Sequence, residues 1–148
     1  MYVSSRMPGH LIRRLHQLST HVFFERMQDA GYDLTPVQFA ALDALRHRPG
    51  TDQAGLAQAI GKDRATVGAV ADRLQQKGLV TRNISARDKR ARELTLTPEG
   101  EALISKLLPV VERLQQEILP GLDEDEYQQF IALAAKAAKA AGTFGEGE

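Results

Sequence analysis

The hydrophobic pattern of this chain changes its period once, in the middle. Residues 79–84 and 92–97 are short runs in which apolar and β-branched side chains alternate with polar ones, a pattern typical of half-buried strands. On both sides of these runs the apolar residues recur every three to four positions, as they do on one face of a helix. Residues 85–91, between the two runs, are polar and basic. The pattern predicts a β-hairpin with a basic tip, flanked by helices.

Start and stop signals predict the ends of these helices. Thr35, Pro36 and Gln38 supply a capping residue, a proline at the first helical position and the glutamine of a capping box. Further N-caps are expected at Thr51 or Asp52, Asp63, Thr97 and Asp123. The expected helices run over residues 8–29, 36–47, 53–60, 64–77, 98–119 and 124–141. We expect Pro109 to kink or split the fifth helix and residues 142–148 to be loose.

The apolar stripes of the helices predict which side chains are buried. The second helix is expected to bury Phe39, Leu42 and Leu45, and the fourth Val67, Val70, Ala71 and Leu74. For the fifth helix the expected stripe is Leu103, Leu107, Val111, Leu114 and Ile118. The first, fifth and sixth helices carry more apolar surface than one small core can cover, which predicts self-association.

The order of these elements predicts a winged helix-turn-helix. Residues 53–60 and 64–77 are two helices joined by a short turn at Gly61–Lys62, and the hairpin follows them. The fold class is therefore mainly α with a small β-hairpin. The second helix of this pair has the place of a recognition helix in the major groove, and its candidate DNA contacts are Arg64, Thr66, Gly68, Ala69 and Arg73. A glycine inside a helix is unfavourable, so Gly68 indicates either close approach to DNA or tight packing against a neighbouring helix.

The charge distribution favours a polyanionic partner. The whole chain has no net charge, but residues 62–92 carry nine Lys and Arg against three acids, while residues 93–148 carry four against eleven. Such a basic block is either a nucleic-acid footprint or a solvated charged face. The hairpin tip concentrates it, with candidate DNA contacts Arg87, Asp88, Lys89 and Arg90 and with Arg92 beside them. We expect Asp88 to hold the Arg90 guanidinium through an ion pair.

Residues 34–101 resemble the MarR family of bacterial transcription factors. The residues that carry the resemblance are Leu34-Thr35-Pro36-Val37-Gln38-Phe39, Asp72-Arg73-Leu74-Gln75-Gln76-Lys77-Gly78-Leu79-Val80, Asp88-Lys89-Arg90 and Leu94-Thr95-Leu96-Thr97-Pro98-Glu99-Gly100. The number and order of the flanking helices also match the family.

The resemblance implies a homodimer that binds a palindromic operator, usually as a repressor. Residues 1–32 and 98–148 would be the dimerisation helices, and residues 33–97 the winged helix-turn-helix. Arg90 would enter the minor groove, steadied by Asp88, and Arg73 would lie near phosphates. Many members lose DNA affinity when a small aromatic acid binds between the two parts.

A polar stripe on the first helix is the candidate effector site. His10, Arg14, Gln17 and His21 fall on one helical face, where Arg14 is suited to clamp a carboxylate. A solvated face or dimer contacts are the alternative interpretation. Residues 8–14 are also similar to the start of MarR-type regulators of nicotinate and related aromatic-acid catabolism.

Other function classes lack their motifs. The chain has no cysteine, which excludes thiolate metal sites, cysteine nucleophiles and thiol redox sensing, and its four histidines lack metal-ligand spacing. It has no phosphate-binding loop and no nucleophile elbow, so we expect neither an enzyme nor a cofactor. It lacks a signal sequence and a membrane span, so a cytoplasmic protein is expected. The alternatives to a specific regulator are a winged helix used for protein contacts and a non-specific DNA-binding protein without an effector.

Overall fold

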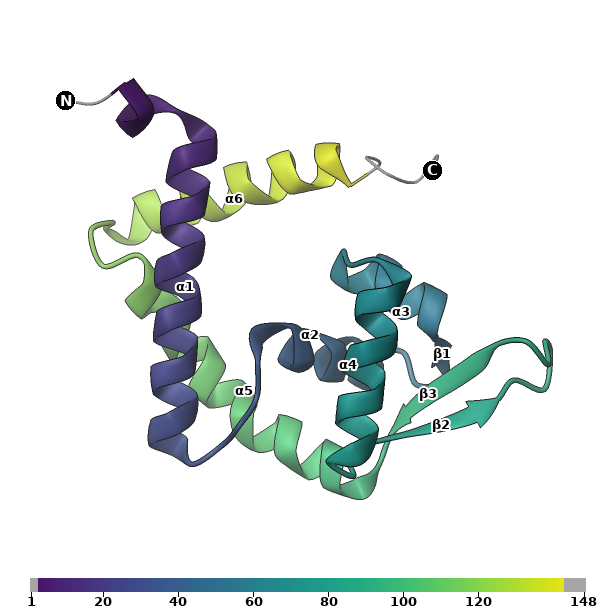
Figure 1. Ribbon diagram of the computed structural model, residues 1–148. Helices are drawn as coiled ribbons and strands as arrows, with labels where there is room; N and C mark the ends of the chain where they lie inside the picture. The colour runs from purple at the N-terminus through teal and green to yellow at the C-terminus, as the bar shows by residue number, and fades with distance from the viewer. Residues whose placement is uncertain (1–2, 143–148) are drawn as a thin grey trace.

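A computed structural model describes residues 3–142 of the chain. It contains a 3-10 turn, six α-helices and three short strands. In chain order these are η1 (Val3–Arg6), α1 (Pro8–Ala30), α2 (Pro36–His47), β1 (Thr51–Asp52), α3 (Gln53–Ile60), α4 (Arg64–Gln76), β2 (Val80–Ile84), β3 (Arg92–Leu96), α5 (Pro98–Ile118) and α6 (Glu124–Ala141). The long helices α1 and α5 pack together on one side, and α2, α3, α4 and the hairpin form a lobe on the other (Figure 1). The expected fold class, mainly helical with a small winged sheet, is confirmed.

The predicted helix starts are confirmed by their capping bonds. Thr35 Oγ1 accepts from the amide of Gln38 at 3.1 Å, and the Gln38 side chain accepts from the amide of Thr35 at 3.2 Å. Asp52, and not Thr51, caps α3, accepting from the amide of Gly55 at 2.7 Å. These bonds join residues three positions apart, which is why the local sequence alone predicts them.

The sheet has one strand more than the sequence indicates. Its order is β1-β3-β2, all antiparallel, with Leu94 and Leu96 of β3 buried as expected. The extra strand β1 pairs Thr51 with Leu94 and Asp52 with Glu93. Two residues are too few to show an alternating pattern, so sequence periodicity gave no sign of β1.

Some expected core positions pack against the core but are only half-buried, and some buried positions were not expected. In α2, Gln38 is buried while Phe39 is half-buried, because the capping box turns the Gln38 side chain back onto the helix start. In α5, Ile104 is fully buried, a position missing from the expected stripe. Val70, Leu103 and Ile118 are half-buried.

Pro109 does not split α5, which is one helix from Pro98 to Ile118. A proline removes the hydrogen bond to the carbonyl four residues earlier. That residue, Ser105, is exposed, so water can satisfy its carbonyl.

The start of α5 is fixed against the end of α4. Thr97 Oγ1 donates to the carbonyl of Gly78 at 2.6 Å, and the amide of Thr97 donates to the carbonyl of Leu79 at 3.0 Å. A Cβ on Gly100 would lie 2.2 Å from the Leu79 oxygen, so only glycine allows this approach. The contact gives a physical reason for the Thr-Pro-Glu-Gly sequence after the hairpin.

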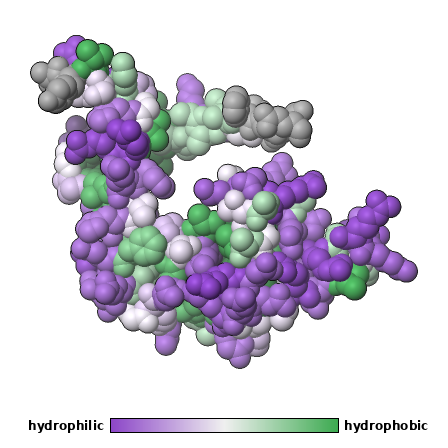
Figure 2. Space-filling view, viewed as in Figure 1, coloured by the Kyte–Doolittle hydropathy of each residue, from purple (hydrophilic) through white to green (hydrophobic). Residues whose placement is uncertain are grey.

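Helix α6 has no buried residue in the single chain. It extends from the end of α5 as an arm, and Figure 2 shows a hollow between this arm and the lobe. Large apolar side chains are exposed on it and on α1, at Leu11, Ile12, Leu18, Phe24, Phe130, Ile131 and Leu133. Of the tail expected to be loose, residues 143–148 lie outside the described residues.

Candidate nucleic-acid interface

The first turn of α4 is held by Asp63. Its carboxylate accepts from the amide of Thr66 at 2.7 Å and from the Thr66 hydroxyl at 3.0 Å, and these two bonds lower the pKa of Asp63. Arg64 and Ala69 are exposed, as expected of a helix that reads DNA, whereas Thr66 is half-buried and uses its proton on Asp63. Arg73 is exposed in the last turn of α4.

Gly68 is not required by tight packing. A Cβ at this position would meet only the Gln53 amide nitrogen, at an ordinary contact distance of 3.8 Å. Of the two explanations for Gly68, packing against a neighbouring helix is therefore not supported.

Arg82, a residue missed by the sequence analysis as a site residue, joins the hairpin to α4. Its Nη1 donates to Asp72 Oδ1 at 2.6 Å, and its Nη2 donates to the carbonyl of Gly68 at 3.3 Å. Arg82 follows Val80 at a spacing of two and so lies on the inner face of β2, where an arginine needs an acceptor. An arginine at an inward position of the alternating pattern was therefore the signal in the sequence that could have identified this contact.

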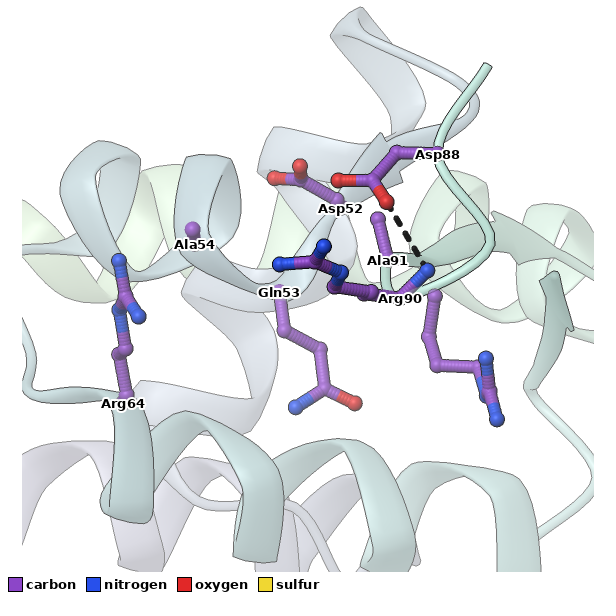
Figure 3. A pocket seen from close by; sticks show the side chains of 8 residues that line it. Asp52, Gln53, Ala54, Arg64, Asp88, Arg90 and Ala91 are labelled. Carbon is purple, nitrogen blue, oxygen red and sulfur yellow. Dashed lines mark hydrogen bonds between the residues drawn. The ribbon is translucent and has the colours of Figure 1, made fainter. Parts of the chain in front are cut away.

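The hairpin tip is built from short side-chain bonds to the backbone. Ser85 Oγ accepts from the amides of Arg87 and Asp88 at 3.1 and 3.3 Å. Asp88 Oδ1 accepts from the amide of Arg90 at 3.0 Å (Figure 3). The expected ion pair between Asp88 and the Arg90 guanidinium is therefore wrong. A short carboxylate two residues before an amide closes a turn with it, so Asp88 orders the backbone under Arg90.

A cavity of about 330 Å³ lies between the hairpin, the start of α3 and the start of α4 (Figure 3). We call it the wing notch; it is lined by Asp52, Gln53, Ala54, Arg64, Asp88, Arg90, Ala91 and Arg92. The fold thus brings Arg64 and Arg90, both predicted DNA contacts, to opposite sides of one depression. Arg87 and Lys89 lie exposed on the tip beside it.

Within the described residues, most of the basic block has no ion-pair partner. Between residues 62 and 92, Lys77 pairs with Asp33 and Arg82 with Asp72. The other basic side chains of the block form no ion pair with any residue in the range 3–142: Lys62, Arg64, Arg73, Arg87, Lys89, Arg90 and Arg92. A face with this much uncompensated positive charge is suited to bind a polyanion.

The comparisons with known proteins agree with this geometry. A family model described as "MarR family" matches residues 32–91. The transcriptional regulator HosA of Escherichia coli O157:H7 is 34% identical over 127 residues, covering 86% of this chain and 91% of HosA. The chain belongs to the MarR family.

Solved structures of MarR-type regulators have the same fold along nearly the whole chain. The Bordetella bronchiseptica regulator BpsR, solved in work on regulation of its DNA binding by 6-hydroxynicotinic acid, is 32% identical with a TM-score of 0.85, over 93% of this chain and 97% of BpsR. The Streptomyces coelicolor regulator PcaV, in complex with its natural ligand, is 32% identical with a TM-score of 0.86, over 95% of this chain and 98% of PcaV. These relatives are transcriptional regulators and indicate no catalytic family. Within residues 3–142, no helix is long and apolar enough to cross a membrane.

The predicted effector residues of this MarR-family chain lie on an open surface of α1. Arg14, Gln17 and His21 are exposed and His10 is half-buried. The His10 ring bonds to Arg13 at 3.1 Å, and His21 lies 3.2 Å from Glu25. A cavity of about 570 Å³ between α2 and α3 is lined by other residues. In the single chain, therefore, the four candidates enclose no ligand site.

Proposed function

We propose that this MarR-family chain forms a homodimer that binds a palindromic operator and represses transcription from it. In each protomer α4 enters the major groove, with Thr66, Gly68 and Ala69 toward the bases and Arg64 and Arg73 toward phosphates. The hairpin places Arg87, Lys89 and Arg90 at the adjacent minor groove, with Asp88 ordering the turn. The observation that carries this proposal is the basic block with its unpaired cations on α4 and the hairpin. As a regulator of transcription it acts where the DNA lies, in the cytoplasm.

The apolar face of the helices outside the lobe supports the proposed dimer. Residues 1–32 and 98–148 are proposed as the dimerisation part, because α1 and α6 expose large apolar side chains that a second copy of the chain can cover. Residues 33–97 are the DNA-binding part. The acidic segment 93–148 belongs mostly to the dimerisation part, away from the DNA.

The experiment is a binding measurement on the DNA upstream of the protein's own coding region, against a scrambled duplex, across a salt series. A steep salt slope with at least about 10³-fold preference for the native duplex supports a specific regulator. A steep slope without preference favours the non-specific DNA-binding alternative, and no binding at low salt favours a winged helix used for protein contacts.

Arg90→Ala tests the minor-groove assignment. Arg90 is exposed and its side chain forms no ion pair with a described residue, so we expect weaker DNA binding and a free energy of unfolding within about 0.5 kcal/mol of wild type. Unchanged DNA affinity contradicts the assignment.

We further propose that a small aromatic carboxylate releases the operator by binding at His10, Arg14, Gln17 and His21. Arg14 clamps the carboxylate, and the second protomer completes the enclosure that a single α1 lacks. The likeness to BpsR and PcaV, whose structures concern ligands, supports a member of the nicotinate and aromatic-acid branch. Arg14→Ala should abolish release of the operator by 6-hydroxynicotinic acid or benzoate analogues and leave operator binding intact. Normal release of the operator by this variant would show that Arg14 does not bind the effector.

A further inference from the structure

The wing notch lies between the two elements proposed to enter the DNA grooves, α4 and the hairpin. The major and minor grooves of B-DNA are separated by the sugar–phosphate backbone of one strand. If α4 occupies the major groove and the hairpin the next minor groove, that backbone must cross the surface between them. The wing notch lies there, with Arg64 of α4 on one side and Arg90 of the hairpin on the other (Figure 3). Arg92 of the hairpin also lines it.

The notch is suited to an anion despite its two carboxylates. Asp52 Oδ1 accepts from the amide of Gly55 at 2.7 Å, and Asp88 Oδ1 accepts from the amide of Arg90 at 3.0 Å, so each carboxylate is engaged by backbone. The guanidinium groups of Arg64, Arg90 and Arg92 form no ion pair with residues 3–142; Arg92 donates only a 3.4 Å bond to the carbonyl of Lys89. Three arginine forks around one depression match the charge and shape of a phosphate.

Ile84 does not line this notch, but it pairs with Arg92, which does. Its side chain is 62% exposed, and it is the one large apolar side chain exposed in the described lobe, residues 32–97. The other exposed large apolar side chains of residues 3–142 lie at or before Phe24 or at and beyond Leu122, on the proposed dimerisation part. Single exposed apolar residues are common, so exposure alone does not indicate a contact, and the position of Ile84 in the hairpin is needed as well.

The register of the hairpin gives that position. Side chains alternate along β2, so Ile84 shares the face of Val80, which is buried, and of Arg82, which contacts α4. Ile84 is also directly opposite Arg92, whose side chain lines the notch. Residues opposite each other in antiparallel strands have neighbouring side chains on one face. Ile84 and Arg92 therefore form an apolar and cationic pair at the edge of the notch.

We propose that the wing notch binds one backbone phosphate of the DNA, held by Arg64 and Arg92, and that Ile84 packs on the adjoining deoxyribose. The inference rests on the proposed DNA-binding function and names the part of the DNA that this site takes. The sugar presents an apolar carbon surface next to each phosphate, which matches an isoleucine beside an arginine. These contacts position the protein on the duplex and do not read its sequence.

The arginine–phosphate contact and the isoleucine–deoxyribose contact are expected to depend differently on salt, so a salt series distinguishes them. The probe is a duplex selected from a random pool by the wild-type protein. Arg92→Gln removes one phosphate contact per protomer, so the slope of log K against log salt should fall by about 1.8 for the dimer. Ile84→Ser removes an apolar contact that releases no counterions, so affinity should fall about tenfold with the slope unchanged. The matched control is Asn83→Ser, because Asn83 is exposed, adjacent and on the other face of the hairpin; it should bind as wild type.

A backbone scan then places the contact on the DNA. Neutral methylphosphonates are introduced one at a time along each strand of the same duplex. One position per half-site, between the major-groove and minor-groove contacts, should weaken wild-type binding and should weaken binding by Arg92→Gln less, because only Arg64 then contacts that phosphate.

The outcomes distinguish this inference from the proposed function. If wild type binds with a steep salt slope but Ile84→Ser binds equally well, or Arg92→Gln keeps the full slope, the wing notch is not a phosphate site and the proposed function stands. If wild type shows no salt-dependent DNA binding, both are wrong. Ile84 and Arg92 are exposed, so both variants should unfold at the wild-type midpoint, and a matched midpoint attributes the binding change to the contact.

Discussion

The link from Arg82 to Asp72 and Gly68 should matter more for DNA recognition than for stability. The Arg82 side chain is 20% exposed and that of Asp72 61% exposed, so water screens the ion pair and its contribution is about 1 kcal/mol. Against this gain, Arg82 Nε is buried with no partner among the described residues, which costs about 1–3 kcal/mol. The ion pair therefore offsets all or part of the cost of burying Nε. Arg82→Met, which keeps the aliphatic stem, should leave the free energy of unfolding unchanged or raise it by up to about 2 kcal/mol.

The effect on DNA binding follows from orientation. The link holds the hairpin against α4, and both must fit adjacent grooves at once. The bonds from the two Nη atoms are directional, whereas the cost of burying Nε is not. A link of about 1 kcal/mol therefore changes the ratio of the linked to the unlinked placement of one hairpin by about fivefold, and two hairpins in a dimer give about 25-fold. We expect Arg82→Met to weaken binding to the selected duplex by about this factor and binding to a scrambled duplex much less. Arg46→Met controls for the lost charge, because Arg46 is exposed at the end of α2.

The direction in which Asp72→Asn changes DNA affinity distinguishes the orientation argument from a simple charge effect. This variant removes a negative charge from α4, the proposed recognition helix, so electrostatics alone predicts tighter DNA binding. Loss of the link predicts weaker binding, with an effect that is not additive with Arg82→Met in the double variant. Fluorescence anisotropy at fixed salt, with urea unfolding at equal protein concentration, measures both quantities. Tighter binding by Asp72→Asn, or additive effects, would refute the orientation argument.

Three other predictions concern stability and assembly. Gly100→Ala should destabilise the fold by about 3 kcal/mol in urea unfolding, because its Cβ would lie 2.2 Å from a backbone oxygen, whereas Gly9→Ala, where a Cβ meets open space, should not. The lowered pKa of Asp63 means that its capping contribution is present above about pH 4 and is lost as pH falls through the lower folded-state pKa. Asp63→Asn keeps a capping oxygen without titrating, so its unfolding midpoint should depend less on pH in this range, and an equal dependence contradicts the assignment. Leu133→Asp on α6 should give monomers in sedimentation velocity, since Leu133 is 66% exposed on the face proposed to pair; a dimer of wild-type strength would locate the interface elsewhere.

The elements that the sequence predicts well are those fixed by near neighbours along the chain. The capping boxes at Thr35 and Asp123 join residues three apart, and the glycines at 31 and 61 end helices in the left-handed conformation. The alternation in residues 92–97 predicts the buried face of β3. Together with the basic block, these local signals are enough for the winged fold and a DNA-binding role.

The features that the sequence does not predict depend on contacts between distant segments. The wing notch joins Asp52, Arg64 and Arg92, which lie on three elements, and the acceptor of Arg82 lies ten residues away on another element. The predicted ion pair of Asp88 is wrong for a related reason. The sequence shows that the Asp88 carboxylate and the Arg90 guanidinium are two residues apart, but the backbone geometry of the turn brings the Arg90 amide, and not its guanidinium, to the carboxylate.

Residues a few positions apart are enough to predict the helices, the hairpin and the positive charge of residues 62–92, because hydrophobic period, capping and charge are local properties of the chain. Contacts between distant segments determine which cations have no ion-pair partner within residues 3–142, where Ile84 is exposed and why residue 100 must be glycine. Those properties arise when segments separated by tens of residues pack within a few ångströms, and one packing contact can redirect a side chain whose sequence neighbours are unchanged.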